Sequence, residues 1–404
     1  MSEHLHSIDG GVTAPRGFLA AGLHCGIKAS GKPDLALVVT ETPASAAGVF
    51  TTNLAVAAPV VVSKEHLAGS GGRARAIVTN SGCANACTGP QGLADAREMT
   101  VLTARALGCD PRDVLVASTG VIGVQLKMAA LRTGIPAAVA ALASGGGLAA
   151  ADAIMTTDPF PKSAAVEIET PAGRIRVGGM TKGSGMIEPR MATMLGYLTT
   201  DAAVDAARLR RVLVGTCRDT FNAITVDGEP STNDCVFALA NGASGVAIDD
   251  ATEAALADGF RAVARELALG IVRGGEGATK LVAITASGAA SEADAWTAAR
   301  AIANSLLVKT AIHGADPNWG RLVAAAGRSG ARFELERARV RIGPLVLFEG
   351  GRPFDERAPE AAAYLQGTDL DIEVDLGTGG GARATVWTCD LSKMYVQINA
   401  EYRT

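Results

Sequence analysis

The segment 182–201, KGSGMIEPRMATMLGYLTTD, is the most unusual stretch of the chain for its possible chemistry, because Ala192 stands directly before Thr193 in its middle. In a strained Ala-Thr bond the threonine hydroxyl can attack the preceding carbonyl, and water then splits the resulting ester. This frees an α-amine on Thr193, with a reference pKa of about 7.7–8.0. Such an amine can act as the base for its own hydroxyl. The segment thus offers a self-made threonine nucleophile for acyl transfer, although Ala-Thr is a common dipeptide and a core threonine in a strand is the plain alternative.

Histidine-based catalysis has little support in this chain. Its five histidines, at positions 4, 6, 24, 66 and 313, form no ligand-like cluster. A serine hydrolase of the α/β type needs a G-x-S-x-G elbow, and the nearest match is only G-S-G at 183–185. A nucleophile that supplies its own base is consistent with this absence.

Two glycine-rich stretches resemble nucleotide-binding loops. The sequence GIKASGK at 26–32 satisfies G-x4-G-K, but Pro33 follows where a Ser or Thr should bind magnesium, and proline has no N–H for a phosphate. The stretch 377–381, GTGGG, lies between two predicted strands and has no following helix, which favours a hairpin loop. A nucleotide-binding protein using Gly26 to Lys32 is therefore a weak alternative.

Composition limits the class of protein. The 404 residues carry 37 basic and 41 acidic side chains, a net charge of −4, and 48% of them are hydrophobic. This excludes intrinsic disorder and gives no support for nucleic-acid binding. The start of the chain lacks the pattern of a secretory signal, no stretch is apolar enough to span a membrane, and seven scattered cysteines fit a reducing compartment, so we expect a cytoplasmic protein. Cys83 and Cys87 have C-x3-C spacing without a second ligand pair, so no metal site is expected.

Helical and strand-like patterns alternate without a regular βαβ rhythm. Apolar spacing predicts helices over 91–107, 203–217, 256–267 and 292–310. Strand patterns cover 34–39, 75–80, 114–117, 164–170, 174–177, 339–342 and 369–376, with the third ending at a Ser118-Thr119-Gly120 turn and the next two forming a hairpin. The mixture predicts an α+β fold with helices packed on β-sheets, and a doubly wound α/β sheet is the second choice.

The chain resembles the family of ornithine acetyltransferases and bifunctional glutamate N-acetyltransferases of arginine biosynthesis. The resemblance spans essentially the whole chain, and the central KGSGMIEPRMATML is its most specific part. The matching motifs are GVTAPRGF (11–18), GIKASGKPDLALV (26–38), AAGVFTTN (46–53), NSGCANACTG (80–89), STGVIG (118–123), AIMTTD (153–158), KGSGMIEPRMATML (182–195), TTDAA (199–203), STND (231–234), EGATK (276–280), LVKTA (307–311) and DPNWGR (316–321).

The resemblance implies a precursor that cuts itself between Ala192 and Thr193. The products would be an alpha chain, 1–192, and a beta chain, 193–404, which stay associated, pair as (αβ)2 and share the α/β/β/α arrangement of N-terminal-nucleophile enzymes. Thr193 would carry the acetyl group. Thr119 and Gly120 match the oxyanion-hole pair, a hydroxyl and a backbone N–H; an ordinary strand-end turn is the plain alternative.

Substrate-binding positions also follow from the resemblance. They are Thr157, Lys182, Thr193, Glu276, Asn399 and Thr404. On charge, Lys182 suits a carboxylate and Glu276 suits an ammonium group of ornithine. The plain alternatives are a loop-capping or solvated lysine, a carboxylate at a helix end and a frayed tail. Cys83 replaces a smaller residue expected in the family and should change packing only, while the sequence leaves the role of the segment around Trp319 open.

The resulting function is acetyl transfer from N2-acetyl-L-ornithine to L-glutamate through acetyl-Thr193. Acetyl-CoA is expected as a second donor, and no bound cofactor is required. Besides the nucleotide-binding hypothesis, two alternatives remain. One is a threonine-nucleophile amidohydrolase or aminopeptidase that passes the acyl group to water. The other is a non-catalytic scaffold that never cuts itself.

Overall fold

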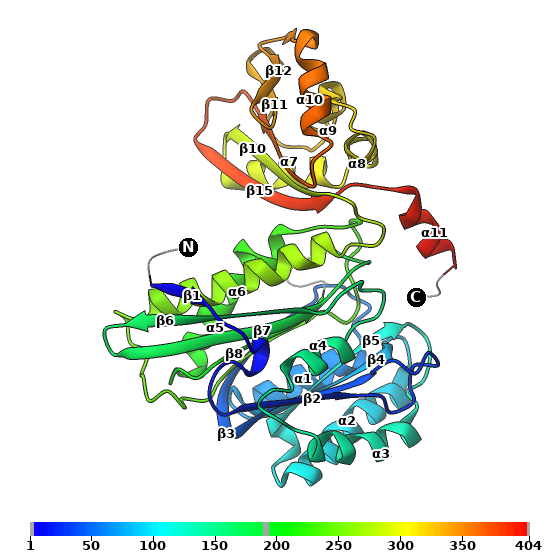
Figure 1. Cartoon of the computed structure of the whole chain (residues 1–404), viewed down its shortest axis with the longest axis vertical. Helices are drawn as coiled ribbons and strands as arrows, with labels where there is room; N and C mark the ends of the chain where they lie inside the picture. The colour runs from blue at the N-terminus through cyan, green and yellow to red at the C-terminus, as the bar shows by residue number, and fades with distance from the viewer. Residues whose placement is uncertain (1–3, 189–193, 402–404) are drawn as a thin grey trace. The chain divides into compact units, whose positions relative to one another are not determined.

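The computed structural model describes residues 4–188 and 194–401. Within it the chain forms two compact units. The first unit comprises residues up to 222 together with 230–271, and the second comprises 223–229 together with 272–403. Each unit has its own sheet and its own helices (Figure 1).

The described part of the first unit is built on a nine-stranded mixed sheet. Its strand order is β1-β6-β7-β8-β9-β3-β4-β5, and β2 pairs with β3 off this path. The pairs β4–β5 and β8–β9 are parallel and the others are antiparallel. The strands are β1 (Leu5–Ser7), β2 (Phe18–Leu23), β3 (Leu35–Phe50), β4 (Arg73–Cys83), β5 (Val114–Val121), β6 (Lys162–Thr170), β7 (Gly173–Lys182), β8 (Leu195–Thr200) and β9 (Cys235–Ala240).

Both faces of this sheet are buried, because successive side chains of a strand point to opposite faces. In β4, Ile77 packs into one core with Leu115, whereas its neighbours Ala76 and Val78 pack into a second core with Val116. Near-continuous apolar runs are typical of strands covered on both sides. The helices of this unit are α1 (Ala58–Gly69), α2 (Gly89–Leu107), α3 (Met128–Ala140), α4 (Gly147–Ala153), α5 (Ala206–Asp219) and α6 (Glu253–Arg273), the last of which runs from the first unit into the second.

The strands on either side of the predicted cleavage bond are neighbours in the sheet. β7 ends at Lys182 and pairs antiparallel with β8, which begins at Leu195. β8 pairs with β9, and β9 in turn pairs with β3. Two strands that follow Thr193 in the sequence therefore lie between strands that precede it.

The described part of the second unit contains a six-stranded sheet of order β13-β12-β11-β14-β10-β15. Its strands are β10 (Leu281–Ala289), β11 (Arg339–Ile342), β12 (Leu345–Glu349), β13 (Arg352–Pro353), β14 (Asp369–Asp375) and β15 (Ala382–Cys389). Its helices are α7 (Glu292–Ala303), α8 (Leu306–His313), α9 (Trp319–Gly327), α10 (Ala358–Tyr364) and α11 (Lys393–Glu401). Apolar side chains from β10, α7 and α9, such as Ile284, Ala298 and Leu322, share one buried core.

Most predicted elements are confirmed, and the differences have local causes. The predicted helix over 292–310 is two helices, because the chain breaks at Asn304 and Ser305 becomes the extended residue before α8. The predicted hairpin at 377–381 is wrong: β14 and β15 lie on opposite sides of β10, and the loop passes around the end of β10, where Thr378 donates to the Gly288 carbonyl.

The α+β class is confirmed by these helices packed on mixed sheets. The doubly wound alternative is wrong, because antiparallel neighbours outnumber parallel ones in both sheets. Within residues 4–188 and 194–401, no helix is long and apolar enough to cross a membrane.

Candidate active site

The end of β5 holds the predicted oxyanion-hole pair, Thr119 and Gly120. β5 extends to Val121, so the two residues belong to a strand where the sequence predicted a turn. Gly120 pairs with Gly82 of β4 and has φ +131°. A Cβ atom at Gly120 would lie 2.4 Å from the carbonyl carbon of Gly82 and 2.5 Å from the nitrogen of Cys83. Position 120 therefore accepts only glycine without a shift of the backbone.

Lys182 joins this strand end to a second segment. Its side chain is buried, and its ammonium donates to the hydroxyl oxygens of Thr119 at 3.2 Å and Thr156 at 2.8 Å. Because the ammonium has only hydrogens to give, the Thr119 oxygen accepts, and the hydroxyl hydrogen of Thr119 remains available for another acceptor. The contact thus orients Thr119 as a donor, the role that an oxyanion hole needs.

Asp158 organises the segment beside Lys182. Its fully buried carboxylate accepts the Lys162 ammonium at 2.6 Å, the Gly183 N–H at 2.7 Å and the Thr156 N–H at 3.0 Å. Burial opposes ionisation, but the charges of Lys182 and Lys162 outweigh it and lower the pKa of Asp158 to about 2. Asp158 is therefore a fixed anion that holds Thr156 and Gly183, the residue after Lys182, in place.

The predicted substrate residue Thr157 is half-buried and lies between Thr156 and Asp158 in the sequence. The hydroxyl of this segment that contacts Lys182 belongs to Thr156, and substrate binding by Thr157 stays a prediction. Sequence reasoning missed Thr156 and Asp158, although the Asp-Lys spacing of four positions in TTDPFPK was a visible signal.

A second buried carboxyl, Asp234, directly precedes β9. Its Oδ2 atom is buried and has no hydrogen-bond partner in the part of the chain that the structure describes. Burial raises the pKa of Asp234 well above its usual range, against the lowering effects of Ser231 and Lys182. Asp234 was missed as a site candidate, although it ends the STND motif.

In the second unit the structure brings together Glu276 and Asn399. Glu276 is buried, and its Oε2 accepts the Asn399 amide at 2.8 Å. Glu276 lies in the turn between α6 and β10, and Asn399 lies on α11, so residues 123 positions apart meet. Both were predicted to bind substrate.

The predicted cleavage site, Ala192-Thr193, and the tail residue Thr404 lie outside the described residues. The structure does describe β8, the strand that follows the cleavage site in the sequence. Leu195, two positions beyond Thr193, pairs with Lys182 on one side and with Cys235 on the other.

Comparison with known proteins decides the family. A model of the ArgJ family matches residues 19–404. The chain belongs to the ArgJ family. The resemblance deduced from the motifs is thereby confirmed.

Relatives in the ArgJ family match along the whole chain. The arginine biosynthesis bifunctional protein ArgJ of Synechococcus sp. is 52% identical over 420 aligned positions, covering 100% of both chains. That of Symbiobacterium thermophilum is 51% identical over 402 positions, covering 98% of this chain and 99% of its own. Among solved structures, a chain of the ornithine acetyltransferase of Mycobacterium tuberculosis, complexed with ornithine, is 45% identical and covers 46% of this chain and 100% of its own, with a TM-score of 0.44.

The phosphate-loop-like motif of this ArgJ-family chain is occupied by its own carboxylate. Asp34 accepts backbone N–H groups from Cys25 at 2.6 Å, Gly26 at 3.2 Å, Ile27 at 2.7 Å and Lys28 at 2.9 Å. Burial opposes ionisation, but these N–H groups lower the pKa of Asp34. Three backbone donors of the motif, those of Gly26, Ile27 and Lys28, are thus already used by a fixed anion, which argues against the nucleotide-binding alternative.

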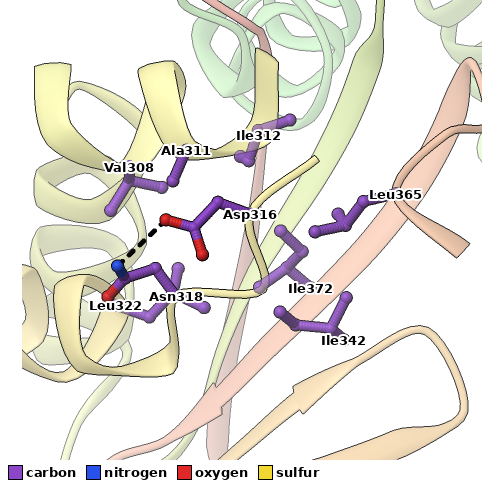
Figure 2. Close-up of a pocket in the computed structure, with 9 residues that line it drawn as sticks. All are labelled: Val308, Ala311, Ile312, Asp316, Asn318, Leu322, Ile342, Leu365 and Ile372. Atoms are coloured by element: carbon purple, nitrogen blue, oxygen red, sulfur yellow. Dashed lines mark hydrogen bonds between the residues drawn. The ribbon is translucent and has the colours of Figure 1, made fainter. Parts of the chain in front are cut away.

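The segment around Trp319 packs within the second unit. Trp319 begins α9 and stacks on Phe348, with ring centroids 4.9 Å apart. The preceding Asp316 and Asn318 line a pocket with an empty volume of about 220 Å³, and the Asn318 amide donates to Asp316 at 3.1 Å (Figure 2). The other lining residues are apolar: Val308, Ala311, Ile312, Leu322, Ile342, Leu365 and Ile372. None of the predicted site residues is among them.

Cys83, the residue that departs from the family pattern, is buried in the core beside β5. Burial raises the pKa of its thiol, which donates to the Val124 carbonyl at 3.2 Å. A neutral, bonded thiol agrees with the expected packing role.

Proposed function

We propose that this chain transfers an acetyl group from N2-acetyl-L-ornithine to L-glutamate through an acetyl-Thr193 intermediate. The observation that carries the proposal is the contact of the Lys182 ammonium with the Thr119 hydroxyl, beside a position restricted to glycine. Members of the ArgJ family named as arginine biosynthesis bifunctional proteins match the chain over its full length, which supports acetyl transfer in arginine biosynthesis here.

The nucleophile would arise by self-cleavage between Ala192 and Thr193. The Thr193 hydroxyl attacks the Ala192 carbonyl, the peptide nitrogen leaves as an amine on the same residue, and water hydrolyses the ester. The sheet order supports lasting association of fragments 1–192 and 193–404. β8 and β9 of the second fragment pair with β7 and β3 of the first, so separation would break two strand interfaces.

In the first half-reaction, the Thr193 amine takes the hydroxyl proton and the oxygen attacks the acetyl carbonyl of N-acetylornithine. The resulting oxyanion accepts hydrogen bonds from the Thr119 hydroxyl and the Gly120 N–H. The C–N bond then breaks, and ornithine leaves with the proton held by the Thr193 amine. In the second half-reaction, the neutral amine of glutamate attacks acetyl-Thr193 and regenerates the hydroxyl.

Lys182 and Glu276 would recognise the charged groups of the substrates. Among the described residues, 4–188 and 194–401, the hydrogen-bond partners of the Lys182 ammonium are two neutral hydroxyls, and its neighbour Asp158 is paired with Lys162. It therefore suits a substrate carboxylate. Glu276, held by Asn399, suits a substrate ammonium group. Thr157 and Thr404 complete the proposed substrate contacts.

Four further features belong to the proposal. Acetyl-CoA would serve as a second donor of the acetyl group to glutamate, and no bound cofactor would take part in either half-reaction. The paired fragments would assemble as (αβ)2 and work in the cytoplasm.

The test uses the purified chain and two variants. Intact-mass analysis should find two fragments in the wild type, one beginning at Thr193. Thr193→Ala should leave a single chain near 40.9 kDa with no transfer, and Thr193→Ser should retain some of both activities. Fully active protein with no species beginning at residue 193 would refute the proposal.

Steady-state kinetics separate transfer from hydrolysis. Initial rates against both substrates should give parallel double-reciprocal lines, because the acetyl group rests on the enzyme between them. Deacetylation of N-acetylornithine at full rate without glutamate would favour the amidohydrolase instead. Acetylation of glutamate by acetyl-CoA tests the second donor.

A further inference from the structure

Asp390, at the end of β15, joins three segments of the second unit. Its carboxylate is buried, and Oδ1 accepts the N–H groups of Thr279 at 2.7 Å and Lys280 at 2.9 Å. Oδ2 accepts the Thr279 hydroxyl at 2.7 Å and faces Nδ1 of His313 at 2.7 Å. One side chain thus anchors the start of β10, the end of α8 and the connection that leads into α11.

The loop that Asp390 holds is the one that carries Glu276. Two residues, Gly277 and Ala278, separate Glu276 from the first anchored residue, Thr279, and the Gly277 carbonyl accepts the Ser392 hydroxyl at 2.6 Å. Gly277 has φ +69°, and a Cβ there would lie 2.5 Å from the backbone nitrogen of Tyr395. The loop and the first turn of α11 are therefore in direct backbone contact.

This contact sets the position of Asn399 relative to Glu276. Asn399 lies one helical turn beyond Tyr395 on α11, and its amide donates both to the Tyr395 carbonyl at 3.0 Å and to Glu276 at 2.8 Å. Asn399 is exposed, so neighbouring side chains do little to hold it. Its place depends on where α11 begins, which is the segment that Asp390 anchors.

We propose that Asp390 is a positioning residue for acetyl transfer, which holds the Glu276 loop against α11 so that Glu276 and Asn399 present one preformed site to the substrate ammonium group. The inference rests on the proposed function. Asp390 itself does not touch substrate, because four donors from the chain surround its carboxylate. It acts through geometry alone.

The chemistry of the anchor predicts which substitution is tolerated. The amide oxygen of Asp390→Asn can still accept both backbone N–H groups, and its NH2 can donate to the Thr279 hydroxyl and to His313 Nδ1. Asp390→Ala loses all four contacts. The asparagine variant should therefore rescue most of what the alanine variant loses.

The experiment compares two reactions of the full chain. One is transfer from N-acetylornithine to glutamate, which needs the Glu276 site. The other is acetylation by p-nitrophenyl acetate, which has no ammonium group and reports on Thr193 and its oxyanion hole. In Asp390→Ala, we expect KM for N-acetylornithine to rise about tenfold, equivalent to about 1.4 kcal/mol, with complete self-cleavage and a p-nitrophenol release rate within about twofold of wild type.

Two variants make the comparison sharper. Glu373→Ala removes another half-buried carboxylate of the same unit, bonded to Ser287 and paired with Arg341, and should leave KM unchanged. Ser392→Ala removes the hydroxyl that donates to the Gly277 carbonyl and accepts the Met394 N–H at the start of α11, and it should raise KM several-fold. If thermal melting shows that Asp390→Ala is unfolded, Ser392→Ala and Asp390→Asn decide the question.

Two results would overturn the proposal. One is that KM for N-acetylornithine is unchanged in Asp390→Ala and in Ser392→Ala, although Glu276→Gln raises that KM. The other is an equal loss of transfer and of p-nitrophenyl acetate turnover, which would assign Asp390 a general structural role. A wild type that fails to cut itself or to form the acetyl-enzyme would instead overturn the proposed function, so the two failures are distinguishable.

Discussion

The ammonium of Lys182 lies 3.2 Å from the hydroxyl oxygen of Thr119, across 63 positions of sequence. One residue ends β7 and the other lies near the end of β5, strands at different places in the same sheet. The contact makes Thr119 a hydrogen-bond donor and places a positive charge beside it. Both effects stabilise negative charge that develops on an acyl oxygen.

Removal of the donor should slow acetylation more than removal of the lysine. Thr119→Ala should reduce the first-turnover rate with p-nitrophenyl acetate by about 10²–10³, the usual loss for one oxyanion donor. Lys182→Met should reduce it by a smaller factor and also raise KM for substrates that carry a carboxylate. Stopped-flow absorbance measures the first-turnover rates of both variants. Lys127→Met is the control, since the Lys127 ammonium also donates to neutral oxygens, the Gly26 and Ile27 carbonyls; a similar loss there would contradict the specific role of Lys182.

A methyl group at position 120 should be far more harmful than one three residues later. Gly120→Ala combines a positive φ with a clash against Gly82, so self-cleavage and acetylation should both fall by about 10² if the strand ends shift by even about 1 Å. Gly123 has φ +79° but open space around its Cβ position. Gly123→Ala should therefore cost about 1 kcal/mol of stability from backbone strain and retain activity. Equal activities in the two variants would contradict the close approach.

Asp158 should stabilise the fold at neutral pH and lose that effect in acid. Its pKa is lowered from an unfolded value of about 3.9 to about 2. The stabilisation is therefore fully present above pH 4 and disappears as the pH falls through 2. Asp158→Asn leaves Lys162 without its ion-pair partner and should cost about 3–5 kcal/mol at pH 7. Urea denaturation at pH 7 and pH 3 should show the difference from wild type shrinking; a constant difference would contradict the assignment.

Asp234 should show the opposite pH dependence. Its pKa is raised by burial, so the folded state binds a proton more tightly than the unfolded state does. Its contribution to stability is therefore greatest below about pH 3.9 and declines as the pH rises towards the folded pKa. Asp234→Asn mimics the protonated acid and should raise Tm relative to wild type more at pH 8 than at pH 5. Melting curves across this range check the sign, and a gain independent of pH would exclude titration of Asp234.

The sequence predicted the helices and strands well where the spacing of apolar residues indicated only one type of secondary structure. The helix over 91–107 appears as α2 and ends at Gly108 with φ +67°, because glycine adopts that conformation easily. The 164–177 hairpin also appears, as β6 and β7. The strand order of each sheet could not be predicted in this way, since pairing across long stretches of chain leaves no local signal. The 377–381 loop, which connects strands that are not neighbours, illustrates this.

The sequence by itself determined the family and the candidate residues, because motifs such as KGSGMIEPRMATML and STGVIG record side-chain chemistry directly. It also pointed to Lys182, Glu276 and Asn399. Only the tertiary structure decided which groups meet: Lys182 with Thr119 and Thr156, and Glu276 with Asn399. Hydrogen bonds and burial depend on distances of a few ångströms in the folded protein, and these distances cannot be read from positions along the sequence. The anchoring roles of Asp158 and Asp390 therefore became visible only once distant segments were packed together.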